Sequence, residues 1–185
     1  VEVVGGVCGT GMACTCLAAD TYASAGSQTS NGDASGSHLH IVEAKGTSTT
    51  DQPKGYADKA ELTCAHCINQ GVQGAVYTHW GSSACPASQV KIYDGYASSS
   101  KNNEGGGSQY LCLTASPSVD QFNLGDQSGP HATPTEYRDS SPTLGTFLSV
   151  LANYDARCSL CVSPGRAWPL LQPGRRDCPA GFTLD

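Results

Sequence analysis

The chain has 185 residues and a formal net charge of −6, and only 14% of its residues are charged. Its 10 Lys and Arg residues are outnumbered by 16 Asp and Glu. This acidic balance argues against nucleic acid or an anionic membrane as a partner, because both are bound through clustered positive charge. Hydrophobic residues make up 38% and aromatic residues 7%, which predicts a thin apolar core, and no segment has the length and apolarity of a membrane helix.

Segments rich in β-branched and aromatic residues predict short strands. In chain order they are residues 39–43, 76–80, 90–96, 110–113 and 168–171. Pro169 restricts the last of these to the edge of a sheet, because proline cannot donate a ladder hydrogen bond.

Stretches of Gly, Ser, Asn, Asp and Pro predict long loops at 22–37, 97–109 and 114–134. Helical periodicity is nearly absent, and its best candidate is the short segment 146–151. The predicted fold class is therefore mostly β, disulfide-rich, with long loops.

Ten cysteines beside a single methionine are typical of a secreted, oxidised protein. Two C-x-x-C pairs, at 64–67 and 158–161, also look like the halves of a four-thiolate zinc site. We favour five disulfides over zinc, because six further cysteines also need a partner. The ten are Cys8, Cys14, Cys16, Cys64, Cys67, Cys85, Cys112, Cys158, Cys161 and Cys178.

The cysteine spacing predicts an internal duplication. Cys16 and Cys64 are 48 positions apart, and Cys112 and Cys158 are 46 apart; each interval ends in a C-x-x-C. Within each interval a histidine precedes a glutamate by five positions, and a basic residue follows two positions later. These residues are His38, Glu43 and Lys45 in one copy, and His131, Glu136 and Arg138 in the other.

A Cys-Pro dipeptide follows each C-x-x-C at nearly the same distance. Cys85 lies 18 positions after Cys67, and Cys178 lies 17 positions after Cys161. We therefore expect one compact domain over 1–185 made of two pseudo-repeats, about 1–74 plus 165–185 and about 75–164. The first repeat would take its Cys-Pro strand from the C-terminal segment, as in a circular permutation.

Several segments resemble the short-chain collagen C4-like proteins of sponges, and more distantly the C4 repeats of basement-membrane collagen. They include Val-Tyr-Thr-His-Trp-Gly at 76–81 with Cys85-Pro86, Ile-Tyr-Asp-Gly-Tyr at 92–96, the Gly-rich approach to Cys112 at 105–113, and 173–184 around Cys178. The resemblance implies an extracellular structural role and a duplicated disulfide-rich β unit. The chain has no Gly-X-Y run, which excludes a collagen triple helix.

The C4 resemblance also implies a disulfide connectivity. It pairs Cys85 with Cys161 and Cys112 with Cys158 in the second copy. In the first copy it pairs Cys67 with Cys178 and Cys16 with Cys64, leaving Cys8 to Cys14. A local scheme, with Cys8–Cys67 and Cys14–Cys178, remains the alternative.

No catalytic motif stands out. Ser35 lies near His38, but the G-x-S-x-G spacing of a hydrolase fails, and the S-x-x-K match at 98–101 lies in a Ser-rich loop. An even number of cysteines leaves no free thiol for a cysteine nucleophile. We expect no enzyme, no catalytic residue, no metal and no cofactor.

Four residues are candidates for surface binding: His38, His40, His131 and Trp80. His38 and His40 would share one face of a strand, and the repeated His–Glu spacing fits structural hydrogen bonds better than a metal site, which needs more ligands. Trp80 and its neighbouring tyrosines either pack a small core or stack on a sugar.

We therefore expect a secreted, non-enzymatic structural protein of an extracellular matrix or of a mineralised, siliceous skeleton. Its partners would be further copies of itself, other matrix proteins, or a silica surface reached through Ser, Thr and Tyr hydroxyls. The alternative is a lectin-like carbohydrate-binding module.

Overall fold

A computed structural model describes residues 3–8, 15–18, 40–45, 53–65, 67, 70–71, 73–100, 109–118, 131–137, 151–173 and 175–183, with the backbone alone at 3–8, 15–18 and 40–41. The described residues form strands and turns and no helix. The strands are β1 (Val3–Cys8), β2 (Thr15–Ala18), β3 (His40–Ile41), β4 (Glu43–Ala44), β5 (Ala60–Glu61), β6 (Gly74–Trp80), β7 (Val90–Ser99), β8 (Leu111–Thr114), β9 (His131–Pro134) and β10 (Arg157–Pro164).

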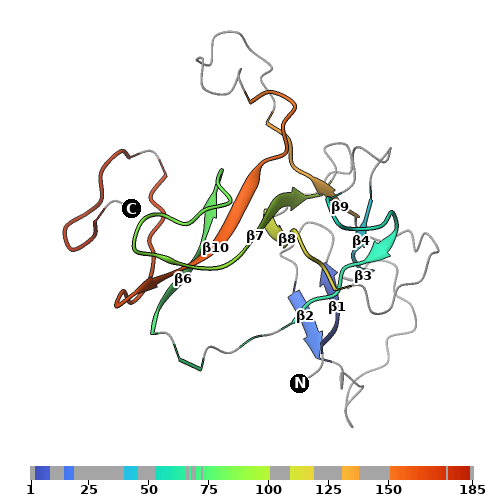
Figure 1. Cartoon of the computed structure of the whole chain (residues 1–185), viewed down its shortest axis with the longest axis horizontal. Coiled ribbons are helices and arrows are strands. Elements are labelled where there is room, and N and C mark those ends of the chain that lie inside the picture. The colour runs from blue at the N-terminus through green and yellow to red at the C-terminus, as the bar shows by residue number, and fades with distance from the viewer. Residues whose placement is uncertain are drawn as a thin grey trace, which may run out of the picture.

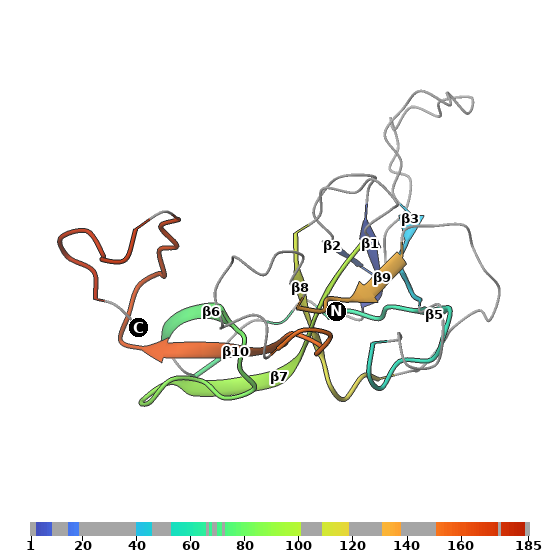
Figure 2. The same ribbon diagram turned by 90° about the horizontal axis from the view of Figure 1, so that it is seen from above.

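The strands form two sheets. A three-stranded sheet has the order β2-β1-β3, and a seven-stranded sheet has the order β5-β4-β9-β7-β10-β6, with β8 added on β7. In Figures 1 and 2 the small sheet lies beside β4 and β9, whereas β6, β7 and β10 extend toward the opposite end of the molecule. We call β1–β5 with the segment to Cys67 the first half, and β6–β10 the second half.

Strand β10 is the centre of the second half. It pairs antiparallel with β6 along its whole length, from Cys158–Trp80 to Pro164–Gly74. Its other edge pairs antiparallel with β7, with a bulge between Leu160 and Cys161. After Arg157, the sequence of β10 is a short run of small and apolar residues without alternation, and consecutive pairs of these residues are buried.

Strand β7 requires a glycine where it meets β8. A Cβ built on Gly95 would lie 1.7 Å from the carbonyl oxygen of Leu113, far inside van der Waals contact. Gly95 pairs with Thr114 across this ladder. A side chain at this position would therefore force the two strands apart.

The core lies where the two halves meet. Its buried cluster is formed by Val42 and Ala44 of the β3–β4 segment, Leu62 after β5, and Ala132 of β9. Tyr56 and Leu113 pack against this cluster from outside. These side chains are small, so the apolar core is thin, in agreement with the composition.

The two halves share two backbone pairings. Cys8 of β1 pairs with His40 of β3, and Ser99 of β7 pairs with Thr133 of β9, 91 and 93 positions further along. Both pairings are antiparallel, and in both cases the first strand also carries a hairpin partner, β2 on β1 and β8 on β7.

The structure confirms the strands predicted at 76–80, 90–96 and 110–113, as β6, β7 and β8. The segment predicted at 39–43 contains β3 and the start of β4, separated by Val42. The predicted helix at 146–151 lies outside the described residues, except for Leu151 in a turn.

Two predictions are wrong. Residues 168–171 form no strand, because no neighbouring strand pairs with them in the structure. Residues 97–99 and 131–134, predicted as loops, belong to β7 and β9. Their Ser, Thr and Pro content favours loops locally, but pairing with neighbouring strands overrides that preference: residues 97–99 pair with β8 and β9, and β9 also pairs with β4 of the first half.

Candidate functional site

Two disulfides fasten the second half. Cys85, in the loop after β6, is bridged to Cys161 of β10, and Cys112 of β8 is bridged to Cys158 of β10. The sequence separations are 76 and 46 residues. Both β10 cysteines are fully buried. The two bridges predicted for the second copy are therefore present, and each closes a long loop onto the central strand.

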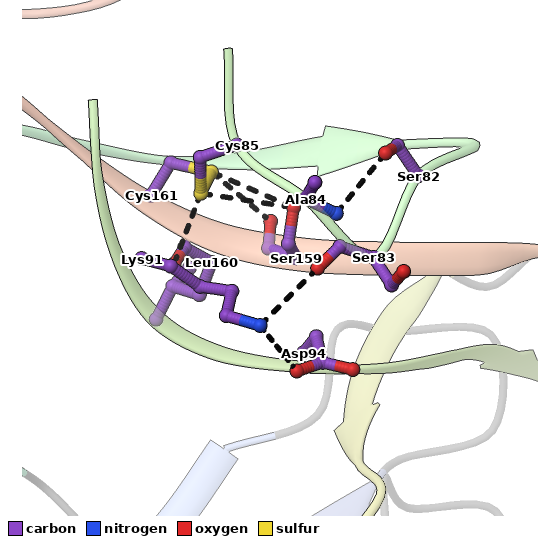
Figure 3. Close-up of a disulfide and its surroundings, with 9 residues drawn as sticks. All are labelled: Ser82, Ser83, Ala84, Cys85, Lys91, Asp94, Ser159, Leu160 and Cys161. Carbon is purple, nitrogen blue, oxygen red and sulfur yellow. Dashed lines mark hydrogen bonds and ion pairs between the residues drawn. A yellow bond between two sulfur atoms is a disulfide. The ribbon is translucent and has the colours of Figure 1, made fainter. Parts of the chain in front are cut away.

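Figure 3 shows the Cys85–Cys161 bridge and its surroundings. The hydroxyl of buried Ser159 lies 3.5 Å from Cys161 Sγ and 3.8 Å from Cys85 Sγ. Sulfur is a weak acceptor, so this hydroxyl is placed to donate to the bridge. The environment is that of a buried structural disulfide rather than of an exposed, reactive one.

A row of charged and polar side chains runs along β7 and β10, beside Ser159, which pairs with Asp94; we call Lys91, Asp94, Tyr96 and Arg157 the charged ladder. Asp94 accepts a hydrogen bond from Lys91 at 2.8 Å and one from Arg157 at 3.1 Å. These two cations, Lys91 through its hydrogen bond above all, hold the pKa of Asp94 below its usual range. Arg157 also donates to the Tyr96 hydroxyl, and Lys54 lies 5.2 Å from the Tyr96 ring centroid.

Most of these charged groups contact one another, although the buried Nε of Arg157 has no hydrogen-bond partner among the described residues. The carboxylate of Asp94 has two cationic partners, and the aromatic ring of Tyr96 lies between Lys54 and Arg157, whose guanidinium carbon is 4.4 Å from the ring centroid. Such cation–π and ion-pair contacts tie the first half, through Lys54, to the second.

The expected disulfide of Cys67 with Cys178 is not formed. Cys67 and Cys178 are free thiols, so the predicted Cys67–Cys178 bridge is wrong, and so is the alternative that paired them with Cys8 and Cys14. Cys64 is disulfide-bonded. Its expected partner Cys16, and the expected Cys8–Cys14 pair, lie outside the described side chains.

The physical reason for the missing bridge is the course of the C-terminal segment. After β10 the chain turns away without pairing, and residues 165–183 extend at the end of the molecule opposite β1–β5 in both views (Figures 1 and 2). No ladder therefore brings Cys178 to Cys67.

A buried charged cluster lies at the junction of the halves. β4 and β9 run parallel, with Glu43 beside His131. The Glu43 side chain is 0% exposed and its Oε2 lies 3.8 Å from Nε2 of His131, whose side chain is 10% exposed. Lys45 Nζ is 3.3 Å from the same His131 nitrogen.

The repeated His–Glu spacing thus acts across the halves rather than within one. Glu43 of the first half meets His131 of the second, whereas Glu136 is exposed and pairs through its backbone with Asp155. His38 lies outside the described residues. The repeated spacing indicates that these histidines and glutamates have a structural role. Only the parallel pairing of β4 with β9 decides that Glu43 lies beside His131.

Of the four residues predicted as surface binding candidates, His131 and Trp80 differ in their exposure. His131 is wrong as a surface residue, because its side chain is nearly buried in the junction. Trp80 is 46% exposed at the end of β6 and packs edge-to-face on Tyr110, which is 60% exposed, with ring centroids 6.3 Å apart. The side chains of His38 and His40 lie outside the described set.

Other chemistry is limited within the described part of the chain. No three His, Cys, Asp or Glu side chains there gather into a group that could hold a metal ion. Among the same residues, no helix is long and apolar enough to cross a membrane. The chain matches no protein-family model, no curated protein and no solved structure.

Proposed function

We propose that this chain is a secreted, non-enzymatic structural protein of an extracellular matrix or mineralised skeleton. The observation that carries the proposal is the pair of bridges Cys85–Cys161 and Cys112–Cys158. They join the Cys-Pro cysteine to the second cysteine of the C-x-x-C, and the next cysteine to the first. This is the pairing that the resemblance to short-chain collagen C4-like proteins implies.

A duplication of C4-like β units is supported by the registers of the two halves. Glu43 pairs with Glu61, and Glu136 pairs with Asp155; the partners are shifted by 93 and 94 positions. One register match could arise by chance. Together with the matched hairpins on β1 and β7, these pairings favour two related units in one domain.

The turns before these pairs also support two related units. Lys59 and Asn153, 94 positions apart, both adopt a positive φ, of 62° and 66°. Each donates its backbone N–H to the equivalent carbonyl, that of Ala44 for Lys59 and of Tyr137 for Asn153. A left-handed conformation is uncommon for a non-glycine residue, so its recurrence at equivalent positions is a specific feature.

The proposed mineral partner is silica, bound through exposed hydroxyl groups. Tyr110 and Tyr154 are 60% and 66% exposed, the largest exposed phenols of the described surface. A phenol can both donate to and accept from surface silanols, and it does so without the charge that a carbonate mineral would favour. The low charged fraction of the chain, 14%, fits this mode of contact.

Adsorption tests the proposal directly. The purified protein is mixed with silica particles at neutral pH, and separately with silicic acid near its solubility limit. We expect saturable adsorption and faster precipitation than with a non-binding protein of similar charge. A chain that neither adsorbs nor precipitates silica would remove the mineral part of the proposal.

A matched variant tests the hydroxyl mode. The double substitution Tyr110→Phe and Tyr154→Phe keeps both rings and removes only the two hydroxyls. We expect weaker adsorption with an unchanged fold, measured by circular dichroism. Unchanged adsorption would exclude these phenols as contacts.

The second candidate is a lectin-like module, favoured by the exposed Trp80–Tyr110 pair. Exposed aromatic rings of this kind stack on the apolar faces of sugars. Glycan-array binding that is lost in Trp80→Ala would establish this function in place of the mineral one.

A further inference from the structure

The second half has a strand for which the described residues of the first half provide no counterpart. In the second half β6 lies along the outer edge of β10, and the loop after β6 carries Cys85 to Cys161. In the first half the positions equivalent to the start of β10 are residues 63–65 and 67, which form no strand. Cys67, equivalent to Cys161, is exposed and free.

The missing strand has a counterpart elsewhere in the chain. β6 begins seven positions after Cys67, and Trp168 lies seven positions after Cys161. The Cys-Pro dipeptides follow at 18 and 17 positions. Residues 165–183, which we call the C-terminal arm, therefore stand to the first half as β6 and its loop stand to the second.

The arm has the surface of a segment that docks. Trp168, Leu170 and Leu171 are 59%, 47% and 89% exposed. Trp168 contacts Phe182 of the same arm, at 5.0 Å between ring centroids. Large apolar side chains gathered on one short segment mark an interaction surface rather than ordinary solvent-facing chain.

The charge distribution favours a second copy of this chain as the partner of the arm. The arm contains three arginines, Arg166, Arg175 and Arg176, and one acidic residue, Asp177, so its formal charge is +2. Because the whole chain has a formal charge of −6, the rest of the chain has a formal charge of −8. The arm is thus the basic part of an acidic protein. It is attracted to the body of another copy, and this attraction raises the rate of encounter.

We propose that the arm of one copy adds as a strand to the first half of a second copy and places its Cys178 against the partner's Cys67. The arm leaves β10 at the end opposite β1–β5 (Figures 1 and 2), away from the first half of its own chain. Strand addition of this kind satisfies edge hydrogen bonds and buries the apolar arm. Exchange of an equivalent element between copies is a low-cost route to assembly.

A disulfide locks the docked arm. A thiolate of one cysteine attacks a small extracellular disulfide such as oxidised glutathione, forming a mixed disulfide and releasing one small thiol. The thiolate of the second cysteine then displaces the other small thiol, and the Cys67–Cys178 bond forms. Two electrons pass to the small disulfide, and the two protein thiol protons end on the two released thiols.

This inference deepens the proposed structural role, on which it rests together with the duplication, by naming the partner as a second copy. It is tested with equal amounts of unlabelled and ¹⁵N-labelled chain, reduced, mixed and refolded in a glutathione redox buffer. The oxidised product is digested without reduction, and the peptide linking Cys67 to Cys178 is analysed by mass spectrometry. We expect equal shares of mixed-label and single-label linked peptide, and covalent oligomers on non-reducing gels.

Two variants sharpen the result. Cys67→Ser with Cys178→Ser should abolish the covalent oligomers and leave the fold unchanged. Trp168→Ala with Leu171→Ala keeps both thiols and removes apolar docking surface, and should slow cross-linking by about tenfold or more. Cross-linking at the unaltered rate would show that the arm does not dock through these side chains.

Linked peptide carrying only one label would mean closure within a chain, and two thiols that remain alkylatable after oxidation would mean no bridge at all. Either result overturns the inference. Silica adsorption of the Cys67→Ser and Cys178→Ser variant separates the two proposals. If it persists while no mixed-label peptide forms, the structural role stands and arm exchange fails.

Discussion

The two halves of this molecule begin from similar sequence patterns and differ in the length and pairing of their described strands. In the second half an eight-residue strand, β10, has a neighbour on each edge and two buried cysteines bridged to the flanking segments. In the first half β3, β4 and β5 have two residues each. Outer strand β6 and its disulfide account for the difference, because a central strand needs partners on both sides to satisfy its backbone.

The comparison extends to the glutamates at equivalent positions. Glu43 is fully buried beside His131 and Lys45, whereas Glu136 is exposed. The same residue in the same local pattern thus holds the junction together in one half and faces solvent in the other.

The largest effect is expected at the bridges. Replacing Cys85 and Cys161 together by alanine should lower the free energy of unfolding by about 2–5 kcal/mol, because the bridge closes a long loop in the unfolded chain. The same change at Cys67 and Cys178 should leave the unfolding of the single chain nearly unaltered, since both are free. Urea denaturation measures both variants. An equal loss in the two would contradict the contrast between the halves.

A somewhat smaller effect is expected at the junction. Glu43→Ala removes a buried carboxylate beside His131 and Lys45, so it should cost about 3 kcal/mol of unfolding free energy. Glu136→Ala, at the exposed equivalent, should stay within about 0.5 kcal/mol of the parent. Guanidinium denaturation distinguishes the two. Equal effects would mean that the junction does not depend on Glu43.

The smallest effect concerns Tyr56, which packs from the first half onto the junction core. Burial, with a contribution from Tyr93, raises the pKa of Tyr56 to about 12 from its usual 10.0. The unfolded chain therefore ionises first as pH rises. The stability contributed by the neutral phenol is complete below pH 10 and is lost as the pH approaches 12.

Ultraviolet titration of tyrosinate measures this shift, and Tyr56→Phe is the control. The variant should lose the late-titrating phenol and part of the alkaline decline in stability. A Tyr56 phenol that titrates with the exposed tyrosines would show that the junction is open to solvent.

The sequence predicts β6, β7 and β8 of the second half because these strands carry local signals. Alternation of β-branched and aromatic residues marks β6 and β7, and the Gly-rich turn before Cys112 marks β8. It missed β10, whose run of Cys, Ser, Leu and Val has no period of two. Its buried residues come in consecutive pairs, Cys158 with Ser159 and Cys161 with Val162, so a search for alternation does not find it.

The sequence by itself determined the class of the molecule, which is a cysteine-rich, mostly β chain with a thin core and a repeated cysteine spacing, and it led to the prediction of two bridges that the structure contains. Only the tertiary structure decided that Glu43 meets His131, that residues 131–134 are a strand, and that the arm leaves the sheet without a partner. The reason is that turns and strand periodicity are local properties of a few neighbouring residues. Pairing between strands more than 80 positions apart depends instead on the course of the whole chain.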